Sequence, residues 1–387
     1  MTLLFWLALI ILLLTIAMSL EVALGMRRTT NIRDVLPMQQ EDIPRVSVII
    51  PACNEADSIE PALQSVLELD YANLEIIVVN DRSTDNTGAV LERMKNRYPN
   101  IILHNISELP KGWMGKSHAL HLGAEQAHGD YFLFTDADIM MEKTTLSRAM
   151  HHMLDNNLDH MSMFFESITQ GGLLNTLIME TGGSLMLLFK PWKAKDKKSK
   201  KYIGVGAFNL VKASAYKAIE GHSALAMHPI DDIMLGKVLK QRGFTQDFLF
   251  GQDFVQVKWY ATVREFINGV MKNTFSVYQF NVMKVLLGIL FIIMFNVLPF
   301  WALFFTSGIT RALFGAAVIV RILLSVNILN IFLETKMSPW FSVWSLVTPY
   351  INIYIVVKAA ITTILNKGIT WRGTYYPLDE LKAKSDL

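Results

Sequence analysis

Residues Tyr131 to Met140 read YFLFTDADIM, a short apolar run that ends abruptly in two carboxylates, Asp136 and Asp138, one residue apart. An apolar run with charges directly after it is typical of a strand buried on both faces. Side chains at the carboxyl end of such a strand lie in the crevice where open α/β sheets bind ligands. Aspartate oxygens suit Mg²⁺ or Mn²⁺, which bind through one or two carboxylates plus substrate phosphates. The stretch therefore indicates a metal–diphosphate site or, as the plainer alternative, an Asx-type turn that closes a strand.

The segments around this stretch, from about residue 44 to residue 250, alternate between strand-like and helix-like patterns. Short β-type runs occupy Val46–Ile50, Leu74–Val79, Ile101–Leu103 and Tyr131–Thr135. Helical candidates lie between them, near Ala56–Leu69, Thr84–Asn96 and Lys116–Ala127. This alternation predicts an α/β fold, with a mostly parallel, Rossmann-like sheet and helices on both faces. No G-x-G-x-x-G follows the first strand, so hydride transfer from a nicotinamide is not expected.

Two of the predicted strands end in polar loops. Val46–Ile50 runs into PACNEADS and Leu74–Val79 runs into NDRSTDNT, each just ahead of a predicted helix. Asn and acidic side chains at these positions are suited to holding a ribose, a base or a phosphate. For Asp81 and its neighbours, capping of the following helix is the alternative.

The composition indicates a protein with both a soluble and a membrane part. Of 387 residues, 52% are hydrophobic and 18% are charged, which fits neither an ordinary soluble enzyme nor a wholly embedded protein. Thr2–Leu20 is uncharged and about long enough to cross a bilayer. It lacks a small-residue cleavage site, so we expect a retained anchor. Arg27, Arg28 and Arg33 follow it and place the next domain on the cytoplasmic side.

Three further apolar segments lie near the C-terminus. Val285–Phe305 and Ile309–Leu333 have the character of spans, whereas Trp340–Leu365 contains Pro349 and is either a third span or a re-entrant segment. The expected organisation is an anchor at 1–24, a catalytic domain at 44–255, interfacial helices at 256–284, membrane segments at 285–366 and a cytosolic tail at 367–387. The single cysteine, Cys53, suits a cytoplasmic domain.

Four motifs in a fixed order carry a family resemblance: VSVIIPACNE, VVNDRSTDNT, PKGWMGKSHAL and FTDAD. Together they resemble the nucleotide-sugar-binding half of a family 2, inverting glycosyltransferase of the GT-A type. The likeness is closest to membrane-anchored enzymes that glycosylate carotenoids and hopanoid-associated lipids, and more distant to ceramide glucosyltransferase. It implies a hexosyltransferase that uses Mg²⁺ or Mn²⁺, takes a UDP-sugar, with UDP-glucose expected, and glycosylates a membrane lipid.

The resemblance also implies roles for individual residues. Glu55 and Asp81 would hold the ribose and the base of a uridine nucleotide, since a carboxylate accepts two hydrogen bonds in one plane. Lys116 would approach the diphosphate or the sugar as a point charge. Asp136 would lie near the ribose or the sugar, and Asp138 would bind the metal.

Further substrate contacts are expected from the loops and from the tail. Pro51 and Asn54 lie in the first polar loop, and Trp113 would stack on the sugar or the lipid, or pack in the core. The tail ITWRGTYYPL resembles a Trp-Arg-Gly-x-x-Tyr signature that follows the last membrane segment in the lipid-glycosylating group. By that likeness Trp371 and Arg372 return to the cytoplasmic face, near the diphosphate.

An acidic pair in the second half of the domain is the candidate for the general base. In HPIDDIMLGKVLKQRGF, Asp231 and Asp232 begin a predicted helix. In the family the second acid of such a pair, followed by x-x-Leu, acts as the base, which selects Asp232. Repulsion between the two charges raises one pKa, and the helix dipole opposes this. The alternative is a plain charge effect at a helix N-terminus. His222 and His228 flank the pair and are able to hydrogen-bond phosphate, without zinc-site spacing.

Two segments have the character of a membrane surface. Gly171–Phe189 is apolar but interrupted, as in an interfacial helix, and Trp259–Phe280 mixes aromatic and basic residues. KPWKAKDKKSKK lies between them and is either a solvated loop or a cluster attracted to anionic headgroups at roughly 1 kcal/mol per charge. No basic stripe with interleaved aromatics predicts nucleic-acid binding.

The sequence also bears on the kind of transfer. Processive polysaccharide synthases of this superfamily carry Q-x-x-R-W on an interfacial helix, and the equivalent stretch here has Val255 and Lys258 at the Gln and Arg positions. This difference favours the transfer of a single sugar. The rival functions are a transferase that loads a polyprenyl phosphate and a catalytically silent membrane scaffold.

Overall fold

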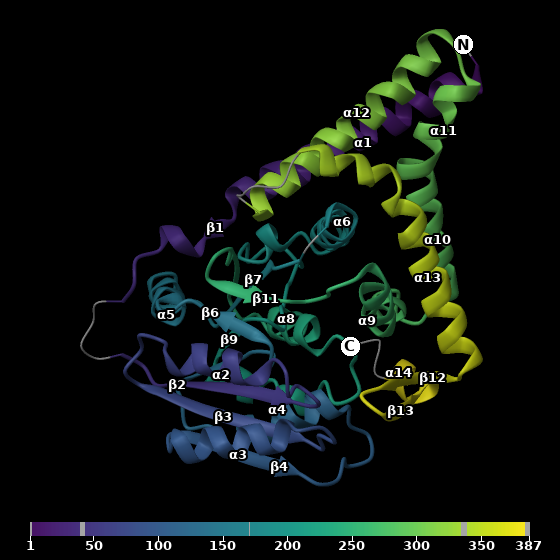
Figure 1. Cartoon of the computed structure of the whole chain (residues 1–387). Helices are drawn as coiled ribbons and strands as arrows, with labels where there is room; N and C mark the ends of the chain where they lie inside the picture. Colours follow the sequence, from purple (N-terminus) through teal and green to yellow (C-terminus); the bar gives the residue numbers. More distant parts are fainter. Residues whose placement is uncertain (1, 39–42, 170, 334–338, 384–387) are drawn as a thin grey trace. The chain divides into compact units, whose positions relative to one another are not determined.

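A computed structural model describes residues 2–38, 43–169, 171–333 and 339–383 of the chain (Figure 1). The chain divides into two compact units, which we describe separately. One contains Met1–Arg28, Thr169–Lys190 and Tyr260–Ile369, and the other contains Thr29–Ile168, Pro191–Trp259 and Thr370–Leu387.

The second unit is built on an eight-stranded sheet with the order β1-β10-β7-β9-β5-β2-β3-β4. Its strands are β1 (Thr30–Asn31), β2 (Val46–Ala52), β3 (Leu74–Asp81), β4 (Ile101–Ile106), β5 (Tyr131–Phe134), β7 (His160–Phe164), β9 (Asn209–Lys212) and β10 (Gln246–Phe250). Only β9 runs antiparallel to its neighbours, β5 and β7, among the pairs that the described residues form. The predicted mostly parallel α/β sheet is confirmed. The strands were recognisable because their side chains are buried on both faces, which leaves continuous apolar runs.

Seven α-helices of this unit lie in the described part of the chain. They are α2 (Ile59–Leu67), α3 (Thr87–Arg97), α4 (Gly115–Glu125), α5 (Thr145–Asp155), α7 (Ala213–Ala218), α8 (Asp231–Gln241) and α14 (Leu378–Ala383). One core cluster joins α4, α7 and α8 to the central strands, with Phe132 and Phe134 of β5 at its centre. This packing fixes the first turns of α4 and α8 beside the carboxyl end of β5.

The helices α2 and α3 each begin three residues later than predicted. The intervening residues form turns held by side chains. Asn54 has a positive φ of 56°, and the Asp85 carboxylate accepts a hydrogen bond from the Thr87 amide at 2.9 Å. Polar side chains that bond to nearby backbone compete with helix formation, which delays the helix start.

Two small sheets complete the unit. β6 (Ile139–Met141), β11 (Val255–Val257) and β8 (Glu166–Ser167) form one, and β12 (Gly368–Trp371) pairs with β13 (Thr374–Pro377) in the other. The interfacial helices predicted from residue 256 start later, at Val263, because Val255–Val257 is a strand. Val255 and Val257 are buried and alternate with a half-buried Gln256, which is the period of a strand.

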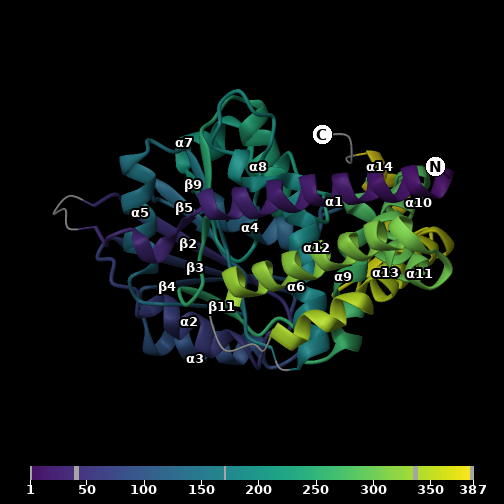
Figure 2. The same cartoon turned by 90° about the horizontal axis from the view of Figure 1, so that it is seen from above.

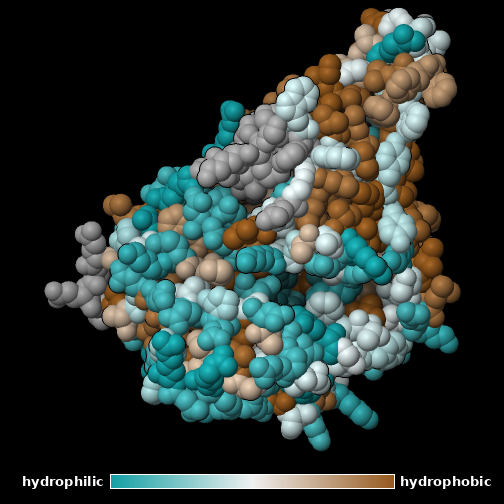
Figure 3. All heavy atoms as spheres, viewed as in Figure 1, coloured by the Kyte–Doolittle hydropathy of each residue, from teal (hydrophilic) through white to brown (hydrophobic). Residues whose placement is uncertain are grey.

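The other unit is helical. It contains α1 (Leu3–Arg28), α6 (Gly172–Phe189), α9 (Val263–Val277), α10 (Val282–Ile292), a π-helical turn (Ile293–Val297), α11 (Leu298–Phe305), α12 (Gly308–Leu333) and α13 (Thr348–Leu365). Figures 1 and 2 show α1 and α12 running side by side, and residues of the two helices are in contact. Figure 3 shows hydrophobic residues gathered over the helices of this unit.

Five helical segments are long and apolar enough to cross a membrane among the residues described: Leu3–Arg28, Gly172–Lys193, Val282–Phe305, Gly308–Val326 and Thr348–Leu365. The apolar segment predicted over Trp340–Leu365 is divided, because Pro339–Leu346 is a 3₁₀-helix and α13 starts only at Thr348. Pro349 lies in the first turn of α13, where backbone N–H groups have no partner within the helix, so the missing N–H of proline costs no hydrogen bond. These helices are compatible with a membrane protein.

An ion pair that is mostly buried, with side chains 13% and 17% exposed, lies inside the helical unit. The Arg321 guanidinium of α12 is 3.3 Å from the Glu180 carboxylate of α6 and donates to the Asn296 carbonyl at 3.0 Å. It also donates to the Ser345 carbonyl, and the Thr348 hydroxyl donates to Glu180. The pair is therefore surrounded by the hydrogen bonds that a charge needs in an apolar setting.

Arg321→Met is expected to destabilise the protein by up to about 3 kcal/mol, because it leaves the mostly buried Glu180 carboxylate without its cation. Thermal unfolding in detergent measures the effect. Arg311→Met on the same helix is the control, since that side chain is exposed and its loss should change little. Equal midpoints for the two variants would show that the buried pair does not hold these helices together.

Candidate active site

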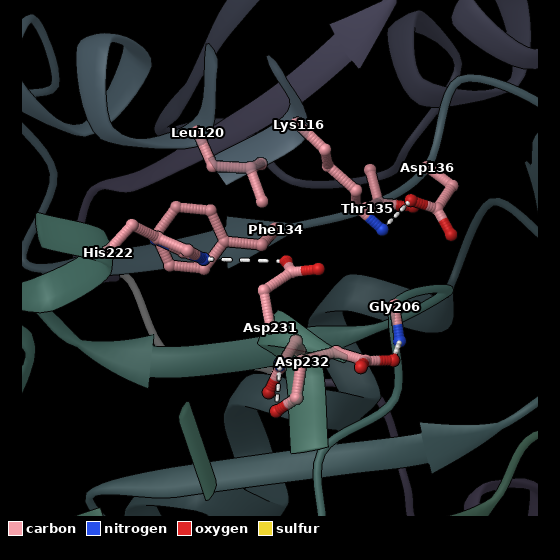
Figure 4. A pocket seen from close by; sticks show the side chains of 10 residues that line it. Lys116, Leu120, Phe134, Thr135, Asp136, Gly206, His222, Asp231 and Asp232 are labelled. Atoms are coloured by element: carbon pink, nitrogen blue, oxygen red, sulfur yellow. Dashed lines mark hydrogen bonds and ion pairs between the residues drawn. The ribbon is translucent and has the colours of Figure 1, made fainter. Parts of the chain in front are cut away.

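A small cavity lies at the carboxyl end of the central strands of the sheet unit (Figure 4). Its walls come from the start of α4, the end of β5, the loop before β9, the short turn Gly221–Ser223 and the start of α8. The residues that line it are Lys116, Leu120, Phe134, Thr135, Asp136, Gly206, Asn209, His222, Asp231 and Asp232. The structure thus brings together Lys116, Asp136 and the acidic pair, which the sequence had only placed in separate motifs.

Three charged groups converge on Gly206. The Lys116 ammonium is 2.5 Å from an Asp136 carboxylate oxygen. A methyl group added at Gly206 would lie 2.8 Å from Asp136 Oδ2, 3.2 Å from Lys116 Nζ and 3.3 Å from Asp232 Oδ2. A side chain at position 206 would therefore displace at least the Asp136 carboxylate from this meeting point. Burial opposes the charge on Lys116, but the carboxylates of Asp136, Asp231 and Asp232 raise its pKa, so the ammonium stays protonated.

The Asp232 carboxylate is oriented by two backbone amides. Its Oδ2 accepts from Gly206 N and its Oδ1 from Ile233 N, both at 2.8 Å. Burial raises the pKa of Asp232, while Lys116 and these two amides oppose the rise. A fixed carboxylate with a raised pKa is what a general base near neutral pH requires.

Asp138 lies in the turn directly after β5, outside the residues that line the cavity. Burial raises its pKa to about 7, and the charges of Asp136 and Glu55 add to the rise. A cation next to this carboxylate would remove that penalty, so its chemistry fits a divalent metal. The described residues contain no group of three or more His, Cys, Asp or Glu side chains that would hold a metal alone. The arrangement that fits is a metal ion bound by the Asp138 carboxylate and by diphosphate oxygens of the substrate.

The first polar loop is tied to the second. Asn54 Oδ1 accepts from Thr84 N at 2.7 Å, and Glu55 N donates to the Thr87 hydroxyl at 2.8 Å. Asn54 therefore braces the two loops with its side chain. Pro51 lies within β2, in register with Val79 of β3.

Asp81 is held by its own neighbour. Arg82 Nε lies 2.7 Å from Asp81 Oδ1, and Arg82 Nη2 lies 3.1 Å from Oδ2. The helix-capping alternative for Asp81 is wrong, because the residue ends β3 and the N-cap position of α3 is Asn86. Gly115 packs on the same carboxylate, since a Cβ there would lie 2.2 Å from Asp81 Oδ2.

The C-terminal hairpin β12–β13 reaches these loops. Arg372 pairs with the Glu55 carboxylate and donates to the Asn54 carbonyl at 3.1 Å. Tyr376 accepts a hydrogen bond through its hydroxyl from the Gly115 amide at 3.1 Å, and Arg82 donates to the Thr374 hydroxyl at 3.2 Å. The tail thus lies beside the residues predicted to hold the uridine.

Both tryptophans singled out in the sequence have an intramolecular partner. Trp113 stacks on His121 of α4, with ring centroids 4.8 Å apart and planes 27° apart. This contact supports the packing role for Trp113. The Arg372 guanidinium lies 5.5 Å from the centre of the Trp371 ring.

The roles of several residues at the site were not predicted from the sequence. Gly206 and Asn209 stand outside any recognisable motif. Arg82 lies in the second polar loop and Tyr376 is the tyrosine of the Trp-Arg-Gly-x-x-Tyr signature, but only their contacts show what they do. His222, which flanks the acidic pair, lines the cavity, and its ring nitrogens face the Tyr216 hydroxyl and the Asp231 carboxylate.

Comparison with known proteins identifies the fold and the domain. The glycosyl transferase family 2 model matches residues 47–219. The 4,4'-diaponeurosporenoate glycosyltransferase of Staphylococcus haemolyticus is 26% identical over 253 residues, 60% of this chain and 62% of that protein. The probable glycosyltransferase YdaM of Bacillus subtilis is 37% identical over 124 residues, 31% of this chain and 29% of that protein. The matches thus span less than two thirds of the length of these relatives.

A solved structure extends the likeness to nearly the whole chain. The mannosyltransferase PcManGT of Pyrobaculum calidifontis, solved with GDP-Man and Mn²⁺, superposes with a TM-score of 0.55 at 18% identity. The match covers 94% of this chain and 100% of that one, and it shows the shared fold. The chain therefore carries a glycosyltransferase family 2 domain with the GT-A fold, and Lys116, Asp136 and Gly206 lie within it.

Proposed function

We propose that the protein is an inverting hexosyltransferase that moves one sugar from a UDP-sugar, with UDP-glucose expected, to a membrane lipid. The observation that carries this proposal is the convergence of Lys116, Asp136 and Asp232 on Gly206 in a family 2 domain. A base on one side of a cavity and a cation on the other is the arrangement that glycosyl transfer requires.

The residues have separate tasks in this reaction. Asp232 takes the proton of an acceptor hydroxyl as the acceptor oxygen bonds to the anomeric carbon. The bond from that carbon to the UDP oxygen breaks on the opposite face, so the configuration inverts. The Lys116 ammonium offsets the negative charge that grows on the departing UDP. A carboxylate acceptor would carry no proton, and Asp232 would then be dispensable.

A divalent metal fits the donor side. Asp138 would hold Mg²⁺ or Mn²⁺, which supplies Lewis-acid stabilisation of the diphosphate when bound. Glu55 and Asp81 would contact the uridine. Arg372, which pairs with Glu55 in the free protein, would exchange this carboxylate for a phosphate of the donor. Pro51 and Asn54 would shape this side of the site.

The acceptor is proposed to be a lipid because of the apolar helices and the likeness to the relative named 4,4'-diaponeurosporenoate glycosyltransferase. We place the protein in the cell membrane, with the sheet unit in the cytoplasm. The lysines that follow α6, among them the exposed Lys195, Lys197 and Lys198, would bind anionic headgroups, each at roughly 1 kcal/mol.

Membranes that contain the protein, incubated with labelled UDP-sugars and then extracted and separated by thin-layer chromatography, test the proposal. We expect label in a lipid from one donor only when Mn²⁺ or Mg²⁺ is present. A labelled lipid that releases its sugar as a phosphate would identify a polyprenyl-phosphate acceptor. No labelled lipid from any donor would favour the silent scaffold.

A further inference from the structure

Two buried side chains behind the acidic pair have no part in the mechanism above. Tyr216 of α7 and His222 of the following turn are 5% and 1% exposed. The Tyr216 ring packs edge-on against Phe132, which fixes its position in the core. His222 lines the cavity that contains Asp231 and Asp232 (Figure 4). The pair therefore connects the rigid core to the catalytic cavity.

The hydrogen bonds of Tyr216 determine which nitrogen of His222 carries the proton. The Tyr216 oxygen accepts from the His222 backbone amide at 3.0 Å and lies 2.8 Å from His222 Nδ1. We assign its one hydroxyl proton to the bond with Nδ1, which then accepts, because this gives the buried hydroxyl both a donor and an acceptor. Burial, together with the charge of Lys116, lowers the pKa of His222 to about 3, so the ring is neutral. A neutral ring that accepts at Nδ1 carries its proton on Nε2.

The protonated nitrogen faces the first acid of the pair. His222 Nε2 lies 3.8 Å from Asp231 Oδ2, as the dashed line in Figure 4 marks. This distance is longer than a formed hydrogen bond. Catalytic hydrogen bonds are often long in the free enzyme and shorten when the substrate binds. A small rotation of the Asp231 side chain would close the gap.

We propose that His222 is a positioning residue for the transfer, which directs the Asp231 carboxylate toward Lys116 and so leaves Asp232 alone to address the acceptor. This inference rests on the proposed function. The amides of Gly206 and Ile233 orient Asp232 through formed hydrogen bonds. His222 faces Asp231 at 3.8 Å and would give it such a bond once the gap closes. Two adjacent carboxylates with different donors have different orientations. This separates the base, Asp232, from the Asp231 carboxylate, whose charge acts on Lys116 together with that of Asp136.

Four variants test this role: His222→Phe, His222→Gln, Tyr216→Phe and the combination of Tyr216→Phe with His222→Phe. His222→Phe should lower kcat about ten- to a hundredfold, the effect of losing one hydrogen bond to a charged group, while KM for the UDP-sugar stays unchanged. His222→Gln should recover most of kcat, because its amide nitrogen reaches the place of Nε2. Tyr216→Phe should lower kcat in part, and the combined variant should be no slower than His222→Phe.

Each outcome decides the role. His222→Phe with the kcat of the wild type overturns it, as does a His222→Gln variant that melts normally but is as slow as His222→Phe. A wild type that is inactive with every UDP-sugar overturns the proposed function and the positioning role with it. Nitrogen NMR of labelled histidine supplies a readout apart from activity. It should show the Nε2-protonated form of His222 in the wild type, and an Nδ1-protonated form would contradict the inference.

Discussion

Asp232→Asn is expected to lower turnover on a hydroxyl acceptor by about 10²- to 10⁴-fold, the usual contribution of a general base. The asparagine keeps the size of the side chain and one oxygen to accept from Gly206 N or Ile233 N, but it cannot take the proton. UDP affinity, measured by calorimetry, should remain close to that of the wild type. Burial raises the pKa of Asp232. Wild-type activity should therefore fall as the pH is lowered, and the fall should be centred above the usual pKa of an aspartate.

Asp155→Asn is the matched control for this variant. Asp155 ends α5, is 67% exposed in its side chain and lies outside the residues that line the cavity. Its replacement should leave turnover unchanged. Normal turnover of Asp232→Asn on a hydroxyl acceptor would show that another group is the base. Activity that survives only with a phosphate or carboxylate acceptor would instead indicate an acceptor that is already an anion.

Asp138→Ala is expected to abolish the metal dependence of UDP binding. The two carboxylates that raise the pKa of Asp138 are both paired within the structure, Asp136 with Lys116 and Glu55 with Arg372. Asp138 is therefore the carboxylate of this group that is best suited to a metal. We expect at least about a 100-fold loss of UDP affinity in Mn²⁺, since loss of an outer-shell partner alone costs 10–100-fold.

Calorimetric titration of UDP with and without Mn²⁺ measures the affinity change. Thermal unfolding gives a second measurement, because a ligand that binds the folded state raises the midpoint. UDP with Mn²⁺ should raise the midpoint of the wild type and of Asp155→Ala, but not that of Asp138→Ala. An unchanged Mn²⁺ effect in Asp138→Ala would mean that the metal, if one binds, is held elsewhere.

Much of the fold could be predicted from local patterns. The strands β2, β3 and β5 are continuous apolar runs because both faces of the sheet are covered, and this burial is visible in the sequence. The predicted start positions of α2 and α3 were less accurate, because the turns ahead of these helices depend on hydrogen bonds between two separate loops. The interfacial helices predicted from residue 256 begin only at Val263, because the side chains of Val255–Val257 alternate with the period of a strand.

The candidate site could be predicted only in its parts. Lys116, Asp136 and the acidic pair each stand in a recognisable motif, and the structure brings them into one cavity. Arg372 contacts Glu55 across 317 positions of sequence, a contact that no local pattern contains. The role inferred for His222 depends on Tyr216, which looks in the sequence like any core tyrosine.

By itself, the sequence determined the α/β class, the apolar segments and the set of candidate carboxylates, because burial and strand ends leave periodic, local signals. Only the tertiary structure decided which of these groups meet. The place of β9 beside β5 brings the loop with Gly206 to Asp136, and the packing of α8 on the core then brings Asp232 to the same point. Such contacts depend on strand order and on close approach at a glycine, and neither is encoded in the spacing of residues along the chain.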